Sequence, residues 1–247
     1  MGRAVVRVAL EAGHRIVGAV DREGSTALGR DAGDLAGATH AGAEVSSDLP
    51  AALLGADCVI DFSTADTVAH AVAAAARAKV AFVSGTTGLG PEAERALDEA
   101  AKRVPVLWSP NMSVGVHVLA EIVKAAVRAL PGYDVEIVEA HHRLKVDAPS
   151  GTAKRLFDAV QEVREARAIS GREGKPGARM DDEVAVLAMR GGDVIGDHTV
   201  HVLGQGERLE LTHRATSREL FARGAVRAAE AIAKRPPGRY TMADVVG

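Results

Sequence analysis

The sequence has few of the features that mark secreted, membrane-spanning or nucleic-acid-binding proteins. A single cysteine, Cys58, allows no intramolecular disulfide. Apolar runs stay short of the roughly 18 residues that span a bilayer. Charges also interrupt the first residues, where a signal peptide would lie, at Arg3, Arg7, Glu11 and Arg15. A net charge of −3 gives no electrostatic reason to expect nucleic acid. We therefore expect a cytoplasmic protein with neither a membrane nor a nucleic-acid partner.

The first half of the chain alternates between helical and strand patterns, which is typical of an α/β fold. With 247 residues, 47% of them hydrophobic, it is long enough for one large domain or two modest ones. We expect strands over residues 15–20, 57–62, 80–84 and 104–108, and helices over 2–12, 49–54, 63–75 and 92–103, with a polar loop over 30–39.

The second half has a different pattern. Pro110 interrupts regular structure and predicts a hinge over residues 109–113, followed by a helix over 114–130. Strand patterns over 184–190, 198–203 and 208–213 are separated by glycines, which predicts an antiparallel meander. A loop over 169–179 precedes them, and a last helix over 226–234 follows.

The most informative stretch runs from residue 138 to 153. A strand pattern leads into His141, His142 and Lys145, and a helix pattern then begins at Ser150-Gly151-Thr152. The start of a helix offers backbone N–H donors that favour a carboxylate or phosphate, and the histidines and lysine can transfer protons near neutral pH. Each feature alone could be polar surface or an ordinary helix start. Together they favour a small anionic substrate that is protonated as it reacts.

Other polar groups follow predicted strands. Asp21-Arg22 could bind a ribose hydroxyl and a 2′-phosphate, although such a pair is also common in turns. Gly85-Thr86-Thr87 could line a ligand crevice or form a simple glycine turn. We interpret His117 as a core or interface residue, and the histidines of the later strands as sheet residues, so we expect no metal site; these are His198, His201 and His213.

The segment Glu139-Ala-His-His-Arg-Leu-Lys-Val-Asp-Ala-Pro-Ser-Gly-Thr-Ala153 resembles the signature of the dihydrodipicolinate reductase family. The residues from Arg190 to His198 are similar to that family as well. The resemblance implies a discontinuous Rossmann-like dinucleotide-binding domain, residues 1–111 and 222–247, and an α+β substrate-binding and oligomerisation domain with an open mixed sheet, residues 112–221. It also implies hinge closure at 111–113 and 221–224, and a homotetramer.

The activity implied by the resemblance is NAD(P)H-dependent reduction of 4-hydroxy-tetrahydrodipicolinate to tetrahydrodipicolinate, in lysine and diaminopimelate biosynthesis. The cofactor would be NADPH or NADH, because both an acid and an arginine, Asp21 and Arg22, follow the strand expected over residues 15–20. His141 would act as donor or acceptor and Lys145 as proton donor, with the immediate donor left open. Substrate-binding residues would be His142, Ser150, Gly151 and Thr152. Cofactor-binding residues would be Met1, Gly2, Asp21, Arg22, Gly85, Thr86, Thr87, Ser109, Pro110, Asn111 and Met112.

The beginning of the chain departs from the family pattern. Members carry a first strand and a Gly-x-x-Gly-Arg loop, whereas this sequence begins at Met1-Gly2-Arg3. We expect that the dinucleotide-binding domain is N-terminally incomplete, and that the missing strand belongs between the strands ending at Asp21 and near Asp61. Two alternatives remain open: a truncated non-catalytic homologue, or another nicotinamide-dependent oxidoreductase of a small dicarboxylate.

Overall fold

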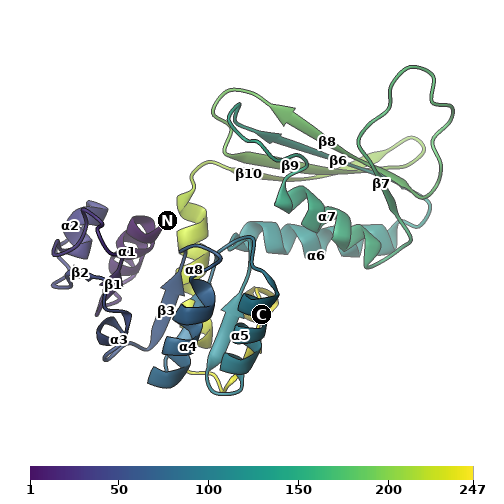
Figure 1. The fold of residues 1–247 in the computed structure, drawn as a ribbon. Coiled ribbons are helices and arrows are strands. Elements are labelled where there is room, and N and C mark those ends of the chain that lie inside the picture. The colour runs from purple at the N-terminus through teal and green to yellow at the C-terminus, as the bar shows by residue number, and fades with distance from the viewer. Residues whose placement is uncertain (247) are drawn as a thin grey trace. The chain divides into compact units, whose positions relative to one another are not determined.

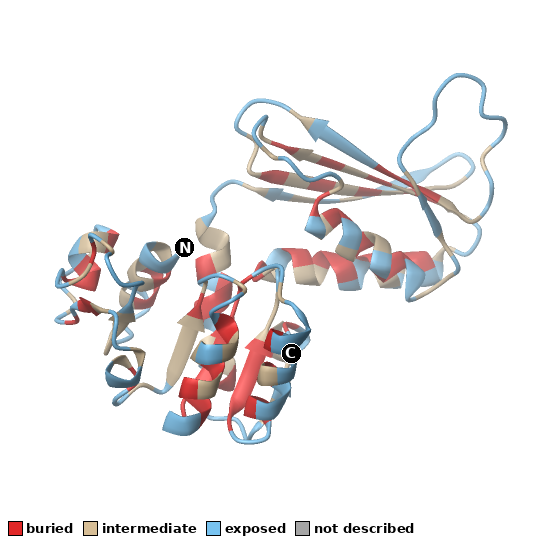
Figure 2. Ribbon diagram, in the orientation of Figure 1, coloured by how far each residue is buried: buried red, intermediate tan, exposed pale blue. Residues whose placement is uncertain are grey.

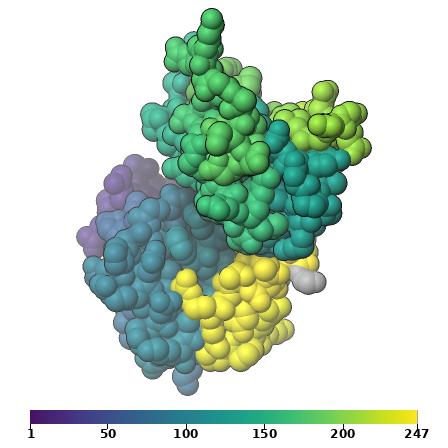
Figure 3. All heavy atoms as spheres, turned by 90° about the vertical axis from the view of Figure 1, so that its right-hand side faces the viewer, coloured from purple at the N-terminus to yellow at the C-terminus, as the bar shows by residue number. Residues whose placement is uncertain are grey.

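The computed structural model describes residues 1–246 and divides into two compact units. The first combines residues 1–113 with the segment from residue 219 onward, and the second comprises residues 114–218. Figure 3 shows the yellow C-terminal segment lying against blue residues from the first half of the chain. The chain therefore leaves the first unit once and returns to it.

The first unit contains a parallel sheet in the order β11-β5-β4-β3 (Figure 1). Its strands are β3 (Cys58–Asp61), β4 (Ala81–Ser84), β5 (Pro105–Trp108) and β11 (Gly238–Tyr240). The helices of this unit are α1 (Gly2–Glu11), α2 (Ala32–Ala36), α3 (Leu49–Ala52), α4 (Val68–Ala78), α5 (Pro91–Ala101), α8 (Glu219–Ile232) and α9 (Ala243–Val246).

Helices pack on both faces of this sheet, because successive strand side chains point to opposite sides. Val59 packs with the core of α4 and α5, which includes Val72 and Leu97. Its neighbour Ile60 packs with α1 and α8, where Val8 and Val226 lie. The carboxyl ends of the parallel strands are left at one edge, where a doubly wound sheet binds its ligands.

A second, smaller ladder joins β1 (Ala19–Val20) to β2 (Val45–Ser46) in parallel. Within residues 1–246, β1 pairs only with β2, and β3 pairs only with β4. The expected strand over residues 15–20 is thus shortened to its last two residues, because a ladder forms only where β2 lies beside it. The predicted loop over 30–39 is also wrong in part, since α2 forms there. Asp31 accepts hydrogen bonds from the amides of Gly33 and Asp34, and Gly37 ends the helix at φ 66°.

The second unit is a mixed sheet in the order β10-β9-β6-β8-β7, covered on one face by two helices (Figure 1). Its strands are β6 (Asp134–His141), β7 (Arg167–Ile169), β8 (Glu183–Arg190), β9 (Gly196–Leu203) and β10 (Arg208–Ala215), and its helices are α6 (Val114–Ala129) and α7 (Gly151–Gln161). Buried residues alternate along β6 and β9, as the red and tan bands in Figure 2 show.

The predicted antiparallel meander is wrong for the first of its three strands. β9 and β10 are antiparallel neighbours, but β6 lies between β8 and β9, and β8 runs parallel to β6. The connection from β6 through α7 and β7 is long enough for the crossover that parallel strands require. β6 consequently becomes the central strand, and Val135 and Ile137 lie in the core beneath α6 and α7.

The structure also places the starts of two predicted helices at other residues. α4 begins at Val68 rather than residue 63, and α8 begins at Glu219 rather than 226. The short strands β7 and β11 were not predicted, because three-residue segments carry too little pattern. Among the described residues, no helix is both long and apolar enough to cross a membrane.

Candidate active site

The alternation of β6 places two polar side chains on its buried, helix-covered face. Val135, Ile137, Glu139 and His141 share that face, and the last two lie at the carboxyl end of the strand. Glu139 is 0% exposed and His141 is 9% exposed. Burial of a charged carboxylate raises the free energy of the fold unless the group is paired and hydrogen-bonded. The partners of Glu139 therefore show which groups it holds in place.

Four donors converge on the Glu139 carboxylate. Arg190, from the end of β8, donates to both oxygens at 2.7 and 2.8 Å. The Nδ1 atom of His141 lies 2.6 Å from Oε2, and the backbone amide of Ser150 donates to Oε1 at 3.0 Å. One carboxylate thus joins the ends of β6 and β8 to the start of α7.

This arrangement determines where His141 carries a proton. Burial raises the pKa of Glu139, but the hydrogen bonds from Arg190, His141 and the Ser150 amide outweigh it, and the net pKa is lowered. An ionised carboxylate can only accept hydrogen bonds, so Nδ1 of His141 must be the donor. The Nε2 atom is then available for proton exchange with a ligand. It lies beside Gly196, where a Cβ would approach it to 3.0 Å.

Ser150 caps α7 and is only 2% exposed. Its hydroxyl oxygen accepts from the Ala153 amide at 3.1 Å and lies 2.9 Å from Nε2 of His198. Burial lowers the pKa of His198 to about 4, helped by His141, so His198 is neutral near pH 7. Because the amide and hydroxyl of Ser150 are engaged within the protein, its predicted substrate contact stays a prediction.

α7 begins at the exposed Gly151 and the half-buried Thr152. Nothing lies within 4 Å of a Cβ placed on Gly151, so there is open space beside this residue. Lys145 donates to Asp147 at 2.7 Å, and Arg190 donates to the Asp147 carbonyl at 2.7 Å. The half-buried His142 follows β6 directly, and its amide donates to Val194. The second unit therefore brings the predicted residues of the signature segment to one region of its sheet.

In the first unit, hydrogen bonds at Asp61 and Thr86 join the carboxyl ends of β3, β4 and β5. Its Oδ2 accepts from the Ser84 hydroxyl at 2.7 Å and the Thr86 hydroxyl at 2.8 Å. Trp108 donates to the Thr86 carbonyl at 2.8 Å. A Cβ at Gly85 would overlap the ring of Phe62, so a larger residue there would require the ring to move.

Of the predicted cofactor residues in these loops, Gly85, Thr86 and Met112 are buried, whereas Thr87 and Pro110 are exposed. The Ser109 hydroxyl donates to the Asn111 carbonyl at 2.7 Å, which closes the loop after β5. Its amide donates to the Ser84 carbonyl at 3.0 Å, so this loop lies beside the Gly85-Thr86-Thr87 loop. Within the first unit, α8 packs tightly against the loop after β5, because a Cβ at Gly224 would overlap the Met112 carbonyl.

The remaining predicted cofactor residues are exposed. The Asp21 carboxylate follows β1 and is held by the Arg22 amide at 2.8 Å and the Ser25 hydroxyl at 2.7 Å. The hydrogen bond from Ser25, with that from the Arg22 amide, lowers the pKa of Asp21, so it is ionised and can accept from ribose hydroxyls. The exposed Arg22 side chain supplies a cation beside it. Met1 and Gly2 lie exposed at the start of α1.

Sequence reasoning missed Glu139, Arg190, His198 and Asp61 as parts of these sites. Glu139 stands two residues before His141, and that spacing alone places both side chains on one face of a strand. This was the available signal. Nothing in the local sequence indicates that Arg190, 51 residues further along the chain, pairs with it.

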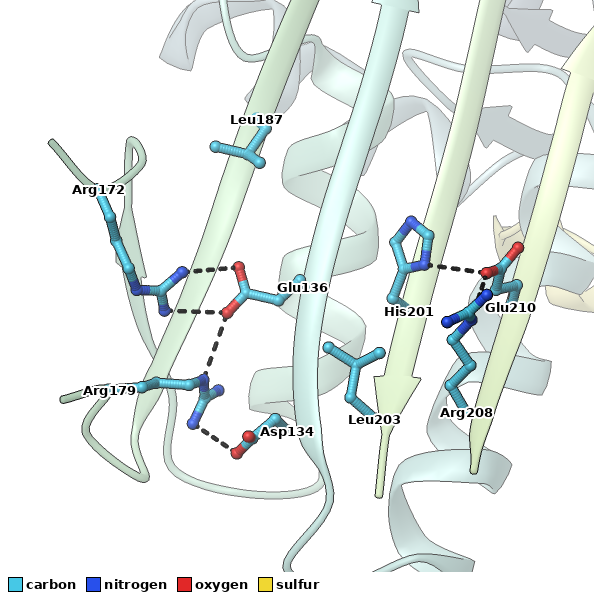
Figure 4. Close-up of a pocket in the computed structure, with 9 residues that line it drawn as sticks. All are labelled: Asp134, Glu136, Arg172, Arg179, Leu187, His201, Leu203, Arg208 and Glu210. Carbon is cyan, nitrogen blue, oxygen red and sulfur yellow. Dashed lines mark hydrogen bonds and ion pairs between the residues drawn. The ribbon is translucent and has the colours of Figure 1, made fainter. Parts of the chain in front are cut away.

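The other face of the second unit carries a separate polar feature. A hollow of about 590 Å³ lies over β6, β8, β9 and β10, away from α6 and α7. Its cations are paired with acids, Arg172 and Arg179 with Glu136, and His201 lies 3.8 Å from Glu210 (Figure 4). The side chains of His201 and His198 thus point to opposite faces of β9, so these two histidines cannot contribute to one site.

Comparison with known proteins covers the whole chain. The family described as "Dihydrodipicolinate reductase, N-terminus" matches residues 1–112, and "Dihydrodipicolinate reductase, C-terminus" matches residues 115–246. A 4-hydroxy-tetrahydrodipicolinate reductase of Anaeromyxobacter dehalogenans is 52% identical, with 100% of this chain and 94% of the relative aligned. The enzyme of the same name from Myxococcus xanthus is 49% identical, with the same shares covered.

Solved structures show the same fold. A dipicolinate-bound dihydrodipicolinate reductase from Paenisporosarcina sp. TG-14 matches with a TM-score of 0.77 at 22% identity, covering 99% of this chain and 94% of the other. GenD2 from gentamicin A biosynthesis, in complex with NAD, matches with a TM-score of 0.59 at 15% identity over 99% and 86% of the two chains. Both family models match, and the two relatives are about 50% identical over the whole chain. The chain therefore belongs to the dihydrodipicolinate reductase family and is an oxidoreductase.

Proposed function

We propose that this oxidoreductase reduces 4-hydroxy-tetrahydrodipicolinate to tetrahydrodipicolinate with a reduced nicotinamide cofactor, in lysine and diaminopimelate biosynthesis. The observation that carries the proposal is the 52% identity to a reductase of that name along the entire chain. The arrangement of the signature segment supports it. A proton-carrying His141, the Lys145 ammonium and an open helix start suit an anionic substrate that gains a proton.

The dicarboxylate binds to the second unit. Its carboxylates accept hydrogen bonds at the start of α7, from Gly151 and Thr152, with His142 and Ser150 nearby. The amides and partial positive charge at a helix N-terminus favour anions. The open space beside Gly151 lets a carboxylate approach the backbone without a side chain in its way.

Bound NADPH or NADH would supply a hydride to a ring carbon of the substrate, and the 4-hydroxyl group would leave as water, so the overall reaction consumes one proton. The protein must then neutralise the charge that develops on the conjugated nitrogen, by supplying a proton there. Lys145 is the donor in this proposal, and its ion pair with Asp147 holds its ammonium group in place. His141, held through Nδ1 by Glu139, presents Nε2 as a second group that can give or accept a proton.

The dinucleotide binds to the first unit. Asp21 accepts from the adenosine ribose, and Arg22 pairs with the 2′-phosphate of NADPH, which leaves both cofactors usable. Gly85, Thr86 and Thr87 line the nicotinamide side, together with Ser109, Pro110, Asn111 and Met112. Met1 and Gly2, at the start of α1, lie toward the phosphates. The hydrogen bonds around Asp61 hold these loops in a fixed conformation.

We also propose a homotetramer built through the open sheet face of the second unit. Leu187 of β8 lines the hollow of Figure 4 and is 36% exposed. Met189, two residues further along the same strand and therefore on the same face, is 60% exposed. Apolar side chains gathered on an uncovered sheet face are a reason for a partner to cover it. A reducing, cytoplasmic location agrees with the single cysteine.

A steady-state assay tests the proposed function. The purified chain is given 4-hydroxy-tetrahydrodipicolinate with NADPH or NADH, and the loss of reduced cofactor and the formation of tetrahydrodipicolinate are followed together. We expect equal amounts of cofactor oxidised and product formed. A keto acid and an amino acid serve as comparison substrates. Cofactor binding without turnover would instead support the non-catalytic homologue, and faster turnover of a comparison substrate would support a different oxidoreductase.

A further inference from the structure

One buried carboxylate, that of Glu139, directly contacts two residues of the proposed substrate region, His141 and Ser150, together with Arg190. Glu139 has no exposed surface, and its two oxygens accept all four of the hydrogen bonds described above. Each oxygen receives one donor from Arg190 and one from a residue of the signature segment. The carboxylate therefore has no room for a ligand of its own and does not touch substrate.

The contacts extend beyond the groups that Glu139 touches. Arg190 also donates to the Asp147 carbonyl at 2.7 Å, and the Asp147 carboxylate pairs with Lys145 at 2.7 Å. On the other side, the Ser150 amide fixes the residue that caps α7 and contacts His198. The Glu139 carboxylate therefore contacts His141 directly and reaches the start of α7 through the Ser150 amide. It reaches Lys145 indirectly, through Arg190 and Asp147.

We propose that Glu139 is a positioning residue: its buried carboxylate fixes the proton of His141 on Nδ1 and holds the start of α7 in place for the substrate carboxylates. The proposal rests on the proposed function for its kinetic consequences. Its structural part, the proton position on His141, stands independently. Without the carboxylate, Nδ1 of His141 and the two Arg190 donors would be left facing one another with no acceptor between them.

Glutamine is the sharpest replacement, because it keeps the shape and removes the charge. Its carbonyl oxygen can replace only one carboxylate oxygen, while its NH2 group would face donors from Arg190 and from either His141 or Ser150. Aspartate keeps the charge but is one methylene shorter, so it should restore function in part. Glu162→Gln is the matched control, because Glu162 also accepts from two cations, Lys124 and Arg155, within the same unit.

The kinetic test measures kcat, KM for the dicarboxylate and the dissociation constant for NADPH in the full chain. For Glu139→Gln we expect kcat to fall by about 100-fold, the loss typical of a misplaced catalytic group, with a raised substrate KM. NADPH binding should change little, because Glu139 belongs to the second unit and the proposed cofactor residues belong to the first. Glu139→Asp should recover part of kcat, and Glu162→Gln should match the unchanged protein. Normal kcat and KM in Glu139→Gln would overturn the proposal.

A spectroscopic test keeps the proposal separate from the proposed function. Nitrogen NMR of protein labelled in its histidines reports which ring nitrogen carries hydrogen, and the His141 signals are assigned by their absence in His141→Gln. We expect Nδ1–H in the unchanged protein and a mixture of tautomers in Glu139→Gln. The same tautomer in both would refute the role of Glu139, even if the enzyme turns over the dicarboxylate. If the unchanged protein fails to turn over but the tautomer shifts, the proposed function fails and the positioning role stands.

Discussion

The ammonium of Lys145 lies in an ion pair with Asp147, so the proposed proton donor is held in the substrate region before any ligand binds. Lys145→Ala should therefore lower kcat by about 100- to 10,000-fold, the range that general acids contribute. The NADPH dissociation constant should change little, because Lys145 belongs to the second unit. Stopped-flow turnover and equilibrium titration of the same preparation measure both. Near-normal turnover would remove Lys145 from the mechanism.

Arg22 offers a second test at the scale of one residue, because its side chain is exposed beside an ionised Asp21. Arg22→Ala should weaken NADPH binding roughly 10- to 100-fold, as expected when a hydrogen-bonded charge pair is lost. NADH lacks the 2′-phosphate, so its binding should be nearly unchanged. Calorimetric titration with both cofactors makes the comparison, and the exposed Arg30 of the same unit provides a control as Arg30→Ala. Equal losses for NADH and NADPH would contradict the phosphate contact.

The sequence was enough to single out the signature segment as the candidate site, but it did not show which of its residues are buried and which contact one another. The pattern places His141, Lys145 and the Ser150-Gly151-Thr152 helix start close together in the chain. It treats Glu139 as one more residue of an alternating strand, although the structure buries it completely. A buried charge is recognisable only when its partners are known, and Arg190 reaches it from another strand.

At the scale of elements, α2 depends on one carboxylate. Asp31 accepts hydrogen bonds from four backbone amides, those of Gly33, Asp34, Ala41 and Ala43. These bonds, that of Ala41 first, outweigh the effect of burial and lower the pKa of Asp31 from 3.8 to about 2. A depressed pKa in the folded state means that the ionised form stabilises the fold. That contribution is present above the unfolded value and is lost as the pH falls through about 2.

Asp31→Asn should accordingly lower the urea midpoint of unfolding near neutral pH, since the amide group faces backbone donors that the carboxylate accepted. The difference from the unchanged protein should shrink as the pH falls from above 4 toward 2. Urea titrations at several pH values measure it, with exposed Asp34→Asn on the same helix as the control. A difference that stays constant over this range would show that the Asp31 charge does not stabilise the loop.

Strand and helix types were largely predictable, whereas strand neighbours were not. The periodicity of β8, β9 and β10 is that of strands in any arrangement, so the sequence favoured the simplest one, a meander. The structure instead inserts β6 between β8 and β9. Register between β6 and its neighbours aligns Glu139 with His198 and His141 with Arg190. The substrate region thus depends on a pairing that no local pattern specifies.

For the whole molecule, the open sheet face of the second unit carries the main prediction. Replacing Leu187 and Met189 together by lysine places two ammonium groups on the proposed tetramer contact, where burial would be strongly unfavourable. We expect the mass from light scattering to fall below that of the tetramer. Leu54→Lys is the control, because Leu54 is 77% exposed and belongs to the first unit. An unchanged mass in the double variant would place the contact elsewhere or exclude it.

The sequence by itself determined the family, the α/β alternation and which residues are candidates for proton transfer and anion binding. These follow from short-range patterns: strand and helix periods, a helix start, and a run of residues that resembles the family signature. Tertiary structure alone decided which strands became neighbours, which charge was buried and which polar groups were satisfied inside the protein. Those properties depend on contacts between residues tens of positions apart, where packing and desolvation, rather than local preference, set the free energy.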